Sequence, residues 1–232
     1  MRDYLSSALL ASVLFISATA VQADYHSSDP WEGFNRSIFE FNEGVDKYAL
    51  KPITLGYKAI TPDPVETGVH NFFENLSDVG SIFNGLLQGK LDSAVQDLAR
   101  VSFNTTLGLG GFIDVSTAMG IDKHDEDFGQ TLAVWGVSSG PYVVLPLFGP
   151  STVRDTAGLV VDTISSPINN IEPDSTRYAV SALQVVDTRA QLLDAESLIT
   201  GDRYIFIRDA YLQRREFSIN DGQVEDYDDD NF

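Results

Sequence analysis

The stretch DFGQTLAVWGVSSGPYVVLPLFGPSTVRD, residues 127–155, has no charged side chain from Phe128 through Val153, although the chain carries 34 acidic residues. A membrane span, a buried core element and a surface that meets an apolar ligand all fit this composition. Four glycines and three prolines interrupt the segment, and they would leave backbone groups unpaired in hydrocarbon. We therefore expect an irregular segment or hairpin near residues 128–150, with a short strand at 143–145, either buried in a helical scaffold or lining a cavity.

Helical patterns flank this stretch on both sides. Aromatic and aliphatic residues recur at spacings of three and four from residue 31 to residue 48, which predicts an amphipathic helix with an aromatic face. We expect it to end at Leu50-Lys51-Pro52, because a proline ring disfavours helical geometry in the residue before it. Similar spacings predict helices over 69–87, 91–103, 174–193 and 202–217. The fold class expected is mainly α.

The two ends of the 232-residue chain differ in composition from the rest. Residues 1–23 hold an apolar run and small residues before a cut after Ala23, which is typical of a cleaved signal peptide. An uncleaved anchor is the alternative, but the run is shorter than the roughly 20 apolar residues that span a bilayer. Residues 221–232 hold six acids in twelve positions, which predicts a disordered acidic tail. Residues 24–220 are expected to form one domain.

Charge and cysteine content exclude several functions. A formal charge of −19 repels polyphosphate, so nucleic acid is not an expected partner. The chain has no cysteine, which excludes disulfides, thiolate metal sites, a cysteine nucleophile and a lipid-bearing cysteine. An exported, acidic protein without thiols fits the periplasmic side of a bacterial envelope.

Two short motifs are candidates for a catalytic serine and for a metal site. Gly136-Val137-Ser138-Ser139-Gly140 fits the letters of a hydrolase nucleophile elbow, but Pro141 follows at once and no histidine lies after His124. The charged run at 122–127 could bind a divalent cation through oxygen atoms, but its spacing is not that of an EF-hand, and such a run is usually solvated. We expect no catalytic residue, no metal and no cofactor.

Several motifs together resemble the MlaA (VacJ) family of Gram-negative outer-membrane lipid-transport proteins. They include DPWEGFNRSIFEFN at 29–42, ARVSFNTTLGLGGFIDV at 99–115, EDFGQTLAVWGVSSGPYVVLPLFGPSTVRD at 126–155 and RDAYLQRREF at 208–217. The resemblance implies a ring-like bundle of amphipathic helices in the inner leaflet of the outer membrane. It also implies that misplaced phospholipid leaves the outer leaflet through an amphipathic channel and passes to a soluble periplasmic lipid carrier, and that the protein associates with a trimeric porin.

The resemblance, together with the apolar patterns, leads us to expect three roles for individual residues. The lipid path or channel wall is expected at Phe128, Trp135, Tyr142, Val144, Leu145, Leu147 and Phe148. Membrane seating is expected from Trp31, Phe34, Ile38, Phe41 and Val45. Gly108, Gly110 and Gly111 are expected to act as a hinge or to allow close packing.

One departure from the family pattern concerns anchoring. Familiar members begin with a lipid-bearing cysteine, and this chain has none. The expectation is a protein that is not a lipoprotein and is held by its amphipathic helices and porin contact. The alternative function is a periplasmic structural or adaptor protein whose apolar faces are all internal core and which has no lipid path.

Overall fold

The computed structural model describes residues 29–223 and is mainly helical, as the sequence predicts. The predicted signal peptide and most of the predicted tail lie outside these residues. In chain order the elements are α1 (Glu32–Val45), η2 (Asp46–Leu50), α2 (Lys51–Ile60), α3 (Asp63–Leu87), α4 (Leu91–Thr106), α5 (Val115–Ala118), α6 (Phe128–Val134), β1 (Tyr142–Leu145), β2 (Gly149–Thr152), α7 (Val153–Ser165), η3 (Pro167–Asn170), α8 (Asp174–Leu192), η4 (Ala195–Leu198) and α9 (Arg203–Ile219).

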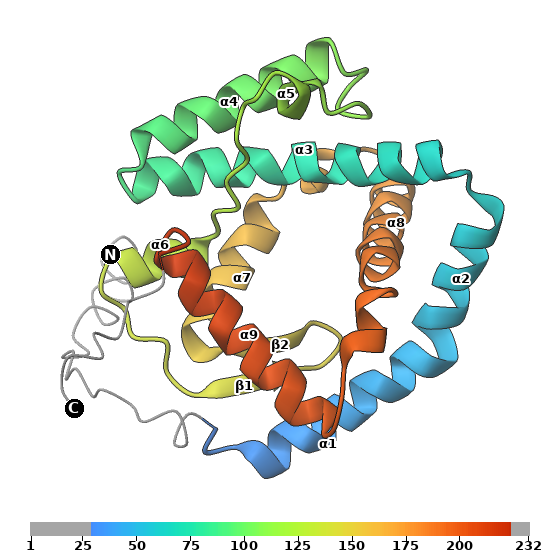
Figure 1. Cartoon of the computed structure of the whole chain (residues 1–232), viewed down its shortest axis with the longest axis vertical. Coiled ribbons are helices and arrows are strands. Elements are labelled where there is room, and N and C mark those ends of the chain that lie inside the picture. The colour runs from blue at the N-terminus through green and yellow to red at the C-terminus, as the bar shows by residue number, and fades with distance from the viewer. Residues whose placement is uncertain (1–28, 224–232) are drawn as a thin grey trace, which may run out of the picture.

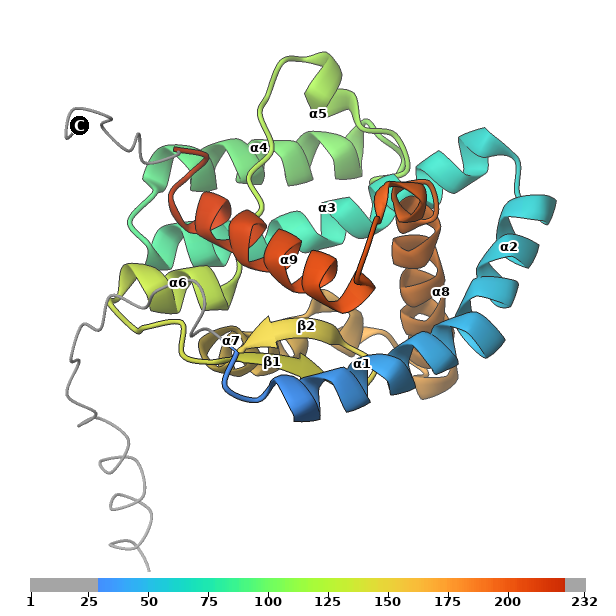
Figure 2. The ribbon, with the colours of Figure 1, turned by 60° about the horizontal axis from the view of Figure 1, so that its bottom comes forward.

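The elements are arranged in a ring (Figure 1). Contacts run from α1 through η2 to α2, and a short connection leads on to α3; α3 meets α6, α6 meets α7, α7 meets β2, and β1 returns to α1. Helix α8 closes the side between α2 and α3, and α9 lies against α6 and β2. Helix α4 packs along the outer side of α3 (Figures 1 and 2).

The first helix does not end at Pro52, contrary to the sequence prediction. The chain passes from α1 through the five π-helical residues of η2 directly into α2, where the N–H of Lys51 donates to the carbonyl of Asp46. This wider turn, with its bond from residue i to i−5, lets the helix accommodate a residue that has no N–H to donate. The result is a curved arm that forms one side of the ring (Figure 1).

The uncharged segment contains the predicted hairpin. Strands β1 and β2 pair antiparallel, with Tyr142 opposite Thr152 and Leu145 opposite Gly149. The turn between them places Leu147 at φ 67° and Gly149 at φ 83°; a positive φ is costly for leucine but free for glycine. The strand expected at 143–145 is confirmed and begins one residue earlier.

Apolar and polar residues are distributed in the reverse of the usual soluble pattern. Within residues 29–223, seven hydrophobic side chains are buried, against 17 polar or charged ones, while 34 large hydrophobic side chains are exposed. Monomeric soluble proteins seldom expose so much apolar surface, and charged residues are seldom fully buried unless paired. In this part of the chain no helix combines the length and the apolar character needed to cross a bilayer.

The interface between α3 and α4 shows how polar groups hold the scaffold. Arg100 of α4 is 3% exposed and donates to the carbonyl of Ile121 at 2.8 Å and to Asp114 at 3.1 Å. Asp78 of α3 lies 3.5 Å from Arg100 and is 1% exposed. Burial raises the pKa of Asp78 to about 6, against the opposing pull of Lys123 and Arg100. Arg100 therefore links α4 by an ion pair to α3 and by hydrogen bonds to the segment around α5.

Candidate functional site

Two asparagines of α1 bind the hairpin to the ring. Asn35 is fully buried; its Nδ2 donates to the carbonyl of Tyr142 at 3.1 Å, and its Oδ1 accepts from the N–H of Val144 at 2.9 Å. Two helical turns later, Asn42 donates to the carbonyl of Leu145 at 2.9 Å and accepts from the N–H of Leu147 at 2.8 Å. Each side-chain amide therefore supplies the bonds that a third strand would supply.

Behind the hairpin lies a small aromatic core, and it changes the predicted lipid path. Tyr142 and Val144 are each 1% exposed and pack with Tyr204 of α9. Strand alternation turns these two side chains to the face opposite Leu145. We therefore correct the prediction that they line a lipid path: they are core residues that join the hairpin to α1 and α9.

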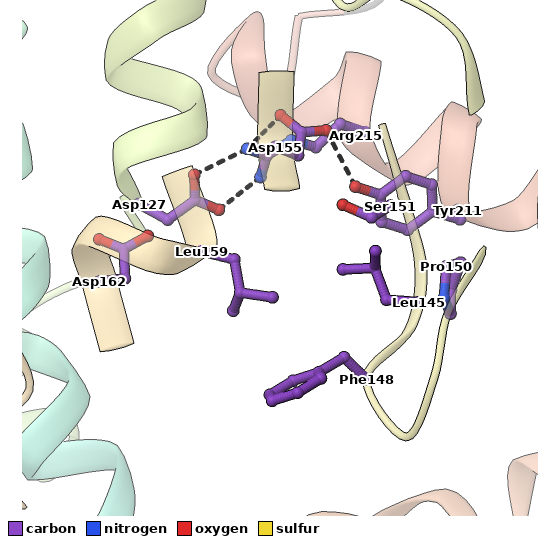
Figure 3. Close-up of a pocket in the computed structure, with 10 residues that line it drawn as sticks. All are labelled: Asp127, Leu145, Phe148, Pro150, Ser151, Asp155, Leu159, Asp162, Tyr211 and Arg215. Carbon is purple, nitrogen blue, oxygen red and sulfur yellow. Dashed lines mark hydrogen bonds and ion pairs between the residues drawn. The ribbon is translucent and has the colours of Figure 1, made fainter. Parts of the chain in front are cut away.

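The other side of the hairpin borders a cavity of about 290 Å³. Figure 3 shows side chains from the hairpin, α7, α9 and the residue that precedes α6 around it. Its apolar wall is formed by Leu145, Phe148, Pro150 and Leu159, and its polar wall by Asp127, Ser151, Asp155, Asp162, Tyr211 and Arg215. We call this space the amphipathic cavity. A space with one apolar and one charged wall suits a ligand that has both kinds of surface.

The polar wall is organised around Arg215. Its Nη2 donates to Asp127 at 2.7 Å and to Asp155 at 2.9 Å, and its Nη1 also donates to Asp127. The Tyr211 hydroxyl donates to Asp155 at 2.9 Å. Burial alone would raise the pKa of Asp155, but the charges of Arg215 and Arg154 hold it below its ordinary value. These bonds tie α9 to the start of α6 and to α7.

The remaining residues predicted to form the path lie around the hairpin and the end of α6. Leu145 and Phe148 line the amphipathic cavity, and Leu147 is 69% exposed at the hairpin turn. Trp135 is 55% exposed; its indole packs edge-on against Phe128, and its Nε1 donates to the carbonyl of Leu87 at 3.1 Å. The structure thus brings Leu145 and Phe148 together and leaves Trp135 beside the end of α3.

The predicted seating residues of α1 separate into two groups. Trp31, Phe34 and Phe41 are 45%, 58% and 52% exposed. Ile38 and Val45 are half-buried, and Ile38 packs against the aromatic core. Only the first three therefore present an apolar face outward.

The predicted glycine hinge contains two tightly packed positions. A Cβ on Gly108 would lie 2.1 Å from the carbonyl oxygen of Ile113, and one on Gly111 would lie 2.8 Å from Asn75. Gly110 has open space around it, and both Gly110 and Gly111 adopt positive φ. Close approach and left-handed backbone account for all three glycines, and hinge motion stays a prediction.

The structure places the Gly-x-Ser-x-Gly motif at 136–140 and the charged run at 122–127 in loops. Ser138 lies in the loop between α6 and β1. The run at 122–127 is not the solvated loop that was expected: Glu126 pairs with Lys90 at 2.8 Å, and Asp97 accepts from His124. Within the described part of the chain, no group of His, Cys, Asp and Glu side chains is placed to hold a metal ion.

Comparison with known protein families and relatives identifies the family of this chain. A family model described as "MlaA lipoprotein" matches residues 27–218. The chain belongs to the MlaA family. It is 36% identical to the "Intermembrane phospholipid transport system lipoprotein MlaA" of Escherichia coli (strain K12), covering 97% of this chain and 92% of the relative. The Haemophilus influenzae protein of the same name is 35% identical, with 85% and 81% covered.

A solved structure of this fold supports the assignment. It is described as "Structural basis for maintenance of bacterial outer membrane lipid asymmetry", shares 37% of its residues, covers 83% of this chain and 100% of its own, and superposes with a TM-score of 0.70. The predicted resemblance to the MlaA family is therefore confirmed, and the helical ring is an MlaA fold.

One prediction about this MlaA-family chain is wrong. We expected a protein that is not a lipoprotein, but the family and the relatives from E. coli and H. influenzae are named lipoproteins. The expectation rested on the absence of cysteine from 232 residues, and that absence alone does not define how a member of a lipoprotein family is anchored. An outer-membrane location agrees with the description of the related structure.

Sequence reasoning missed the polar residues of this MlaA site. Asn35 and Asn42 stand seven residues apart inside the apolar stripe of α1, and a polar residue on an otherwise apolar face was the available signal. Arg215, near the end of α9, is an internal ion-pair partner of Asp127 and Asp155. Its partners lie 60 and 88 residues away, so no local pattern marks the cluster.

Proposed function

We propose that this chain is the outer-membrane component of a phospholipid transport system. In this role it removes misplaced phospholipid from the outer leaflet, passes it along the ring and releases it to a soluble periplasmic lipid carrier. The observation that carries the proposal is the amphipathic cavity beside the hairpin, in a molecule with few buried and many exposed apolar side chains. A phospholipid needs both an apolar surface for its chains and a polar surface for its head group.

The transport proposed here involves no bond chemistry. The Asp155 carboxylate on the polar wall is engaged in ion pairs and in a hydrogen bond from Tyr211, and Ser138 lies in a loop with Pro141 close behind. The protein therefore acts by binding and guiding a lipid, and we assign it no catalytic residue.

The exposed aromatic side chains of α1 fit a seat at the membrane. Trp31, Phe34 and Phe41 lie along one amphipathic helix, and tryptophan favours the interface between lipid and water. The outer membrane is thus one proposed partner, and a trimeric porin and the soluble carrier are the proposed protein partners. The family resemblance supports these two protein partners.

The test is to delete the gene and measure phospholipid exposed on the cell surface. The wild-type gene is expected to restore low exposure, and so is Phe148→Leu, which keeps the cavity wall apolar. Phe148→Asp is expected to fail, because it places a charge on the apolar wall while Phe148 is 68% exposed and carries little of the fold. Immunoblotting of the envelope fraction checks that the two variants are equally abundant.

Normal lipid asymmetry in the deletion strain would overturn this proposal and favour a structural or adaptor role. Full rescue by Phe148→Asp would remove the amphipathic cavity from the lipid path. Co-purification of porin and carrier with the wild-type protein tests the two protein partners separately.

A further inference from the structure

The polar wall of the amphipathic cavity contains a carboxylate that has no counter-ion. Asp162 of α7 accepts from the N–H of Phe128 at 3.2 and 3.1 Å and from Asn84 at 3.4 Å. Among residues 29–223, no Lys, Arg or His nitrogen lies within 4.0 Å of its oxygens. Hydrogen bonds hold this side chain in place, and the positive charge of Arg215 acts on it only from beyond ion-pair distance.

The single cation on that wall is already engaged. Arg215 directs both terminal nitrogens at Asp127 and Asp155, and its Nε is buried and has no hydrogen-bond partner. The lining carries three carboxylates, Asp127, Asp155 and Asp162, against Arg215, and Arg154 also pairs with Asp155 at 2.9 Å from outside the lining, which leaves one net negative charge. An anionic group entering the cavity would meet this negative charge, and both terminal nitrogens of Arg215 are already directed at carboxylates.

We propose that this wall binds the primary ammonium group of a phospholipid head group, with Asp162 as its main partner. The glycerol end and the first part of the chains would lie on Leu145, Phe148 and Leu159, which face the same space (Figure 3). This inference rests on the proposed lipid transport and adds the class of head group. The ammonium supplies the positive charge that Asp162 lacks and directs N–H donors at its oxygens.

The same geometry sets an order among head groups. An ethanolamine head group offers three N–H donors and a compact charge. A choline head group carries the charge on methyl groups and cannot donate, and the cavity lining offers it two aromatic side chains, Phe148 and Tyr211, rather than a cage of ring faces. A glycerol head group leaves the lipid with net negative charge. The expected preference is ethanolamine over choline over glycerol.

The experiment measures which lipids the purified full-length chain takes from mixed vesicles. Vesicles contain equal parts of phosphatidylethanolamine, phosphatidylcholine and phosphatidylglycerol, and the bound lipid is extracted and quantified by mass spectrometry. For the wild type we expect ethanolamine lipid to exceed glycerol lipid by about tenfold, the value of a charge-assisted hydrogen bond in a partly solvated site. Soluble ethanolamine alone, measured by calorimetry, is expected to show no saturable binding.

Asp162→Asn is the deciding variant. It keeps an oxygen that accepts from Phe128, so the fold is retained, which thermal unfolding checks. We expect the ratio of bound ethanolamine lipid to bound glycerol lipid to fall to within about threefold of one, while the total amount of bound lipid stays unchanged. Asp92→Asn, the same change at an exposed position of α4, is the control and is expected to keep the wild-type ratio.

Three outcomes would overturn the inference. They are an unchanged ratio in Asp162→Asn, a wild-type chain that takes glycerol lipid as readily as ethanolamine lipid, and tight binding of soluble ethanolamine. These results leave lipid binding itself intact. A wild-type chain that takes up no phospholipid would instead refute the proposed function, together with the inference that depends on it.

Discussion

Replacing Asn35 by alanine tests whether side-chain amides hold the hairpin to α1. The change removes the bonds to the carbonyl of Tyr142 and the N–H of Val144, at 3.1 and 2.9 Å, and also the bond to Asp29 at 2.8 Å, which lies outside the hairpin. Asn35 is 0% exposed, so water cannot replace the amide without opening the structure. Each buried group left without a partner costs about 1–3 kcal/mol, so the two hairpin groups together give a loss of about 2–6 kcal/mol in the free energy of unfolding. Denaturant unfolding in a mild detergent measures it.

Asn42→Ala provides a comparison with the same chemistry and a different degree of burial. Asn42 is half-buried and bonds to the carbonyl of Leu145 and to the N–H of the exposed Leu147. Water can take over these bonds, so the expected loss is about 1 kcal/mol. Asn71→Ala, which removes one exposed bond to the carbonyl of Phe112, is the control, with an expected change of less than about 0.5 kcal/mol.

The reasoning fails if the two losses are equal, or if Asn35→Ala costs no more than the Asn71 control. Either result would mean that the hairpin is held by the aromatic core around Tyr142 alone. A large loss from Asn35→Ala with an unchanged denaturant slope would show that the native state is destabilised as a whole, because the slope follows the surface exposed on unfolding.

Three further predictions concern the scaffold. The folded pKa of Asp78, about 6, exceeds the ordinary 3.8, so Asp78 contributes stability below pH 4 that is lost as the pH rises through 6. In unfolding titrations at a series of pH values, Asp78→Asn should remove about 3 kcal/mol of this decline in the free energy of unfolding. The same dependence of the unfolding free energy on pH in both proteins would contradict this. Gly108→Ala should prevent normal folding, because its Cβ would lie 2.1 Å from a carbonyl oxygen. Gly33→Ala, whose Cβ would have no atom within 4 Å, should leave stability unchanged or raise it. Circular dichroism measures both. Arg215→Met should cost about 1.5–3 kcal/mol in thermal unfolding because Asp127 loses its ion-pair partner and Asp155 keeps only Arg154. Equal stability in Arg215→Met and the exposed Arg214→Met would refute a structural role for the ion pair.

Periodicity and turn residues were sufficient to predict most of the fold. The spacing of apolar residues predicted α1, α3, α4, α8 and α9, and the glycines and prolines predicted the hairpin. The predicted helix end at Pro52 is wrong because it assumes α-helical hydrogen bonding around the proline. The π-helical turn before it shifts the bonding pattern and lets the helix continue. Such a turn depends on backbone adjustment that side-chain types do not record.

The candidate site was only partly predictable. The uncharged stretch was correctly expected to form a hairpin, but its pattern did not say which face of β1 would be covered. Alternation assigns Tyr142 and Val144 to one face and Leu145 to the other. Only the position of α9, which follows β1 by some 60 residues in the chain, decides that the first face is the core.

Composition cannot reveal the inverted distribution of polar and apolar residues. The hydrophobic fraction of 43% is that of an ordinary globular protein, and the arrangement differs only in where those residues lie. A ring has too little interior to bury its apolar side chains, so the contacts between helices must be closed by directional bonds such as those of Asn35, Arg100 and Arg215. Each of these is intolerant of change because a buried partner would be left unsatisfied. The exposed apolar residues, in contrast, need only stay apolar, which leaves the outer surface and the cavity wall free to vary while the polar joints of the ring are retained.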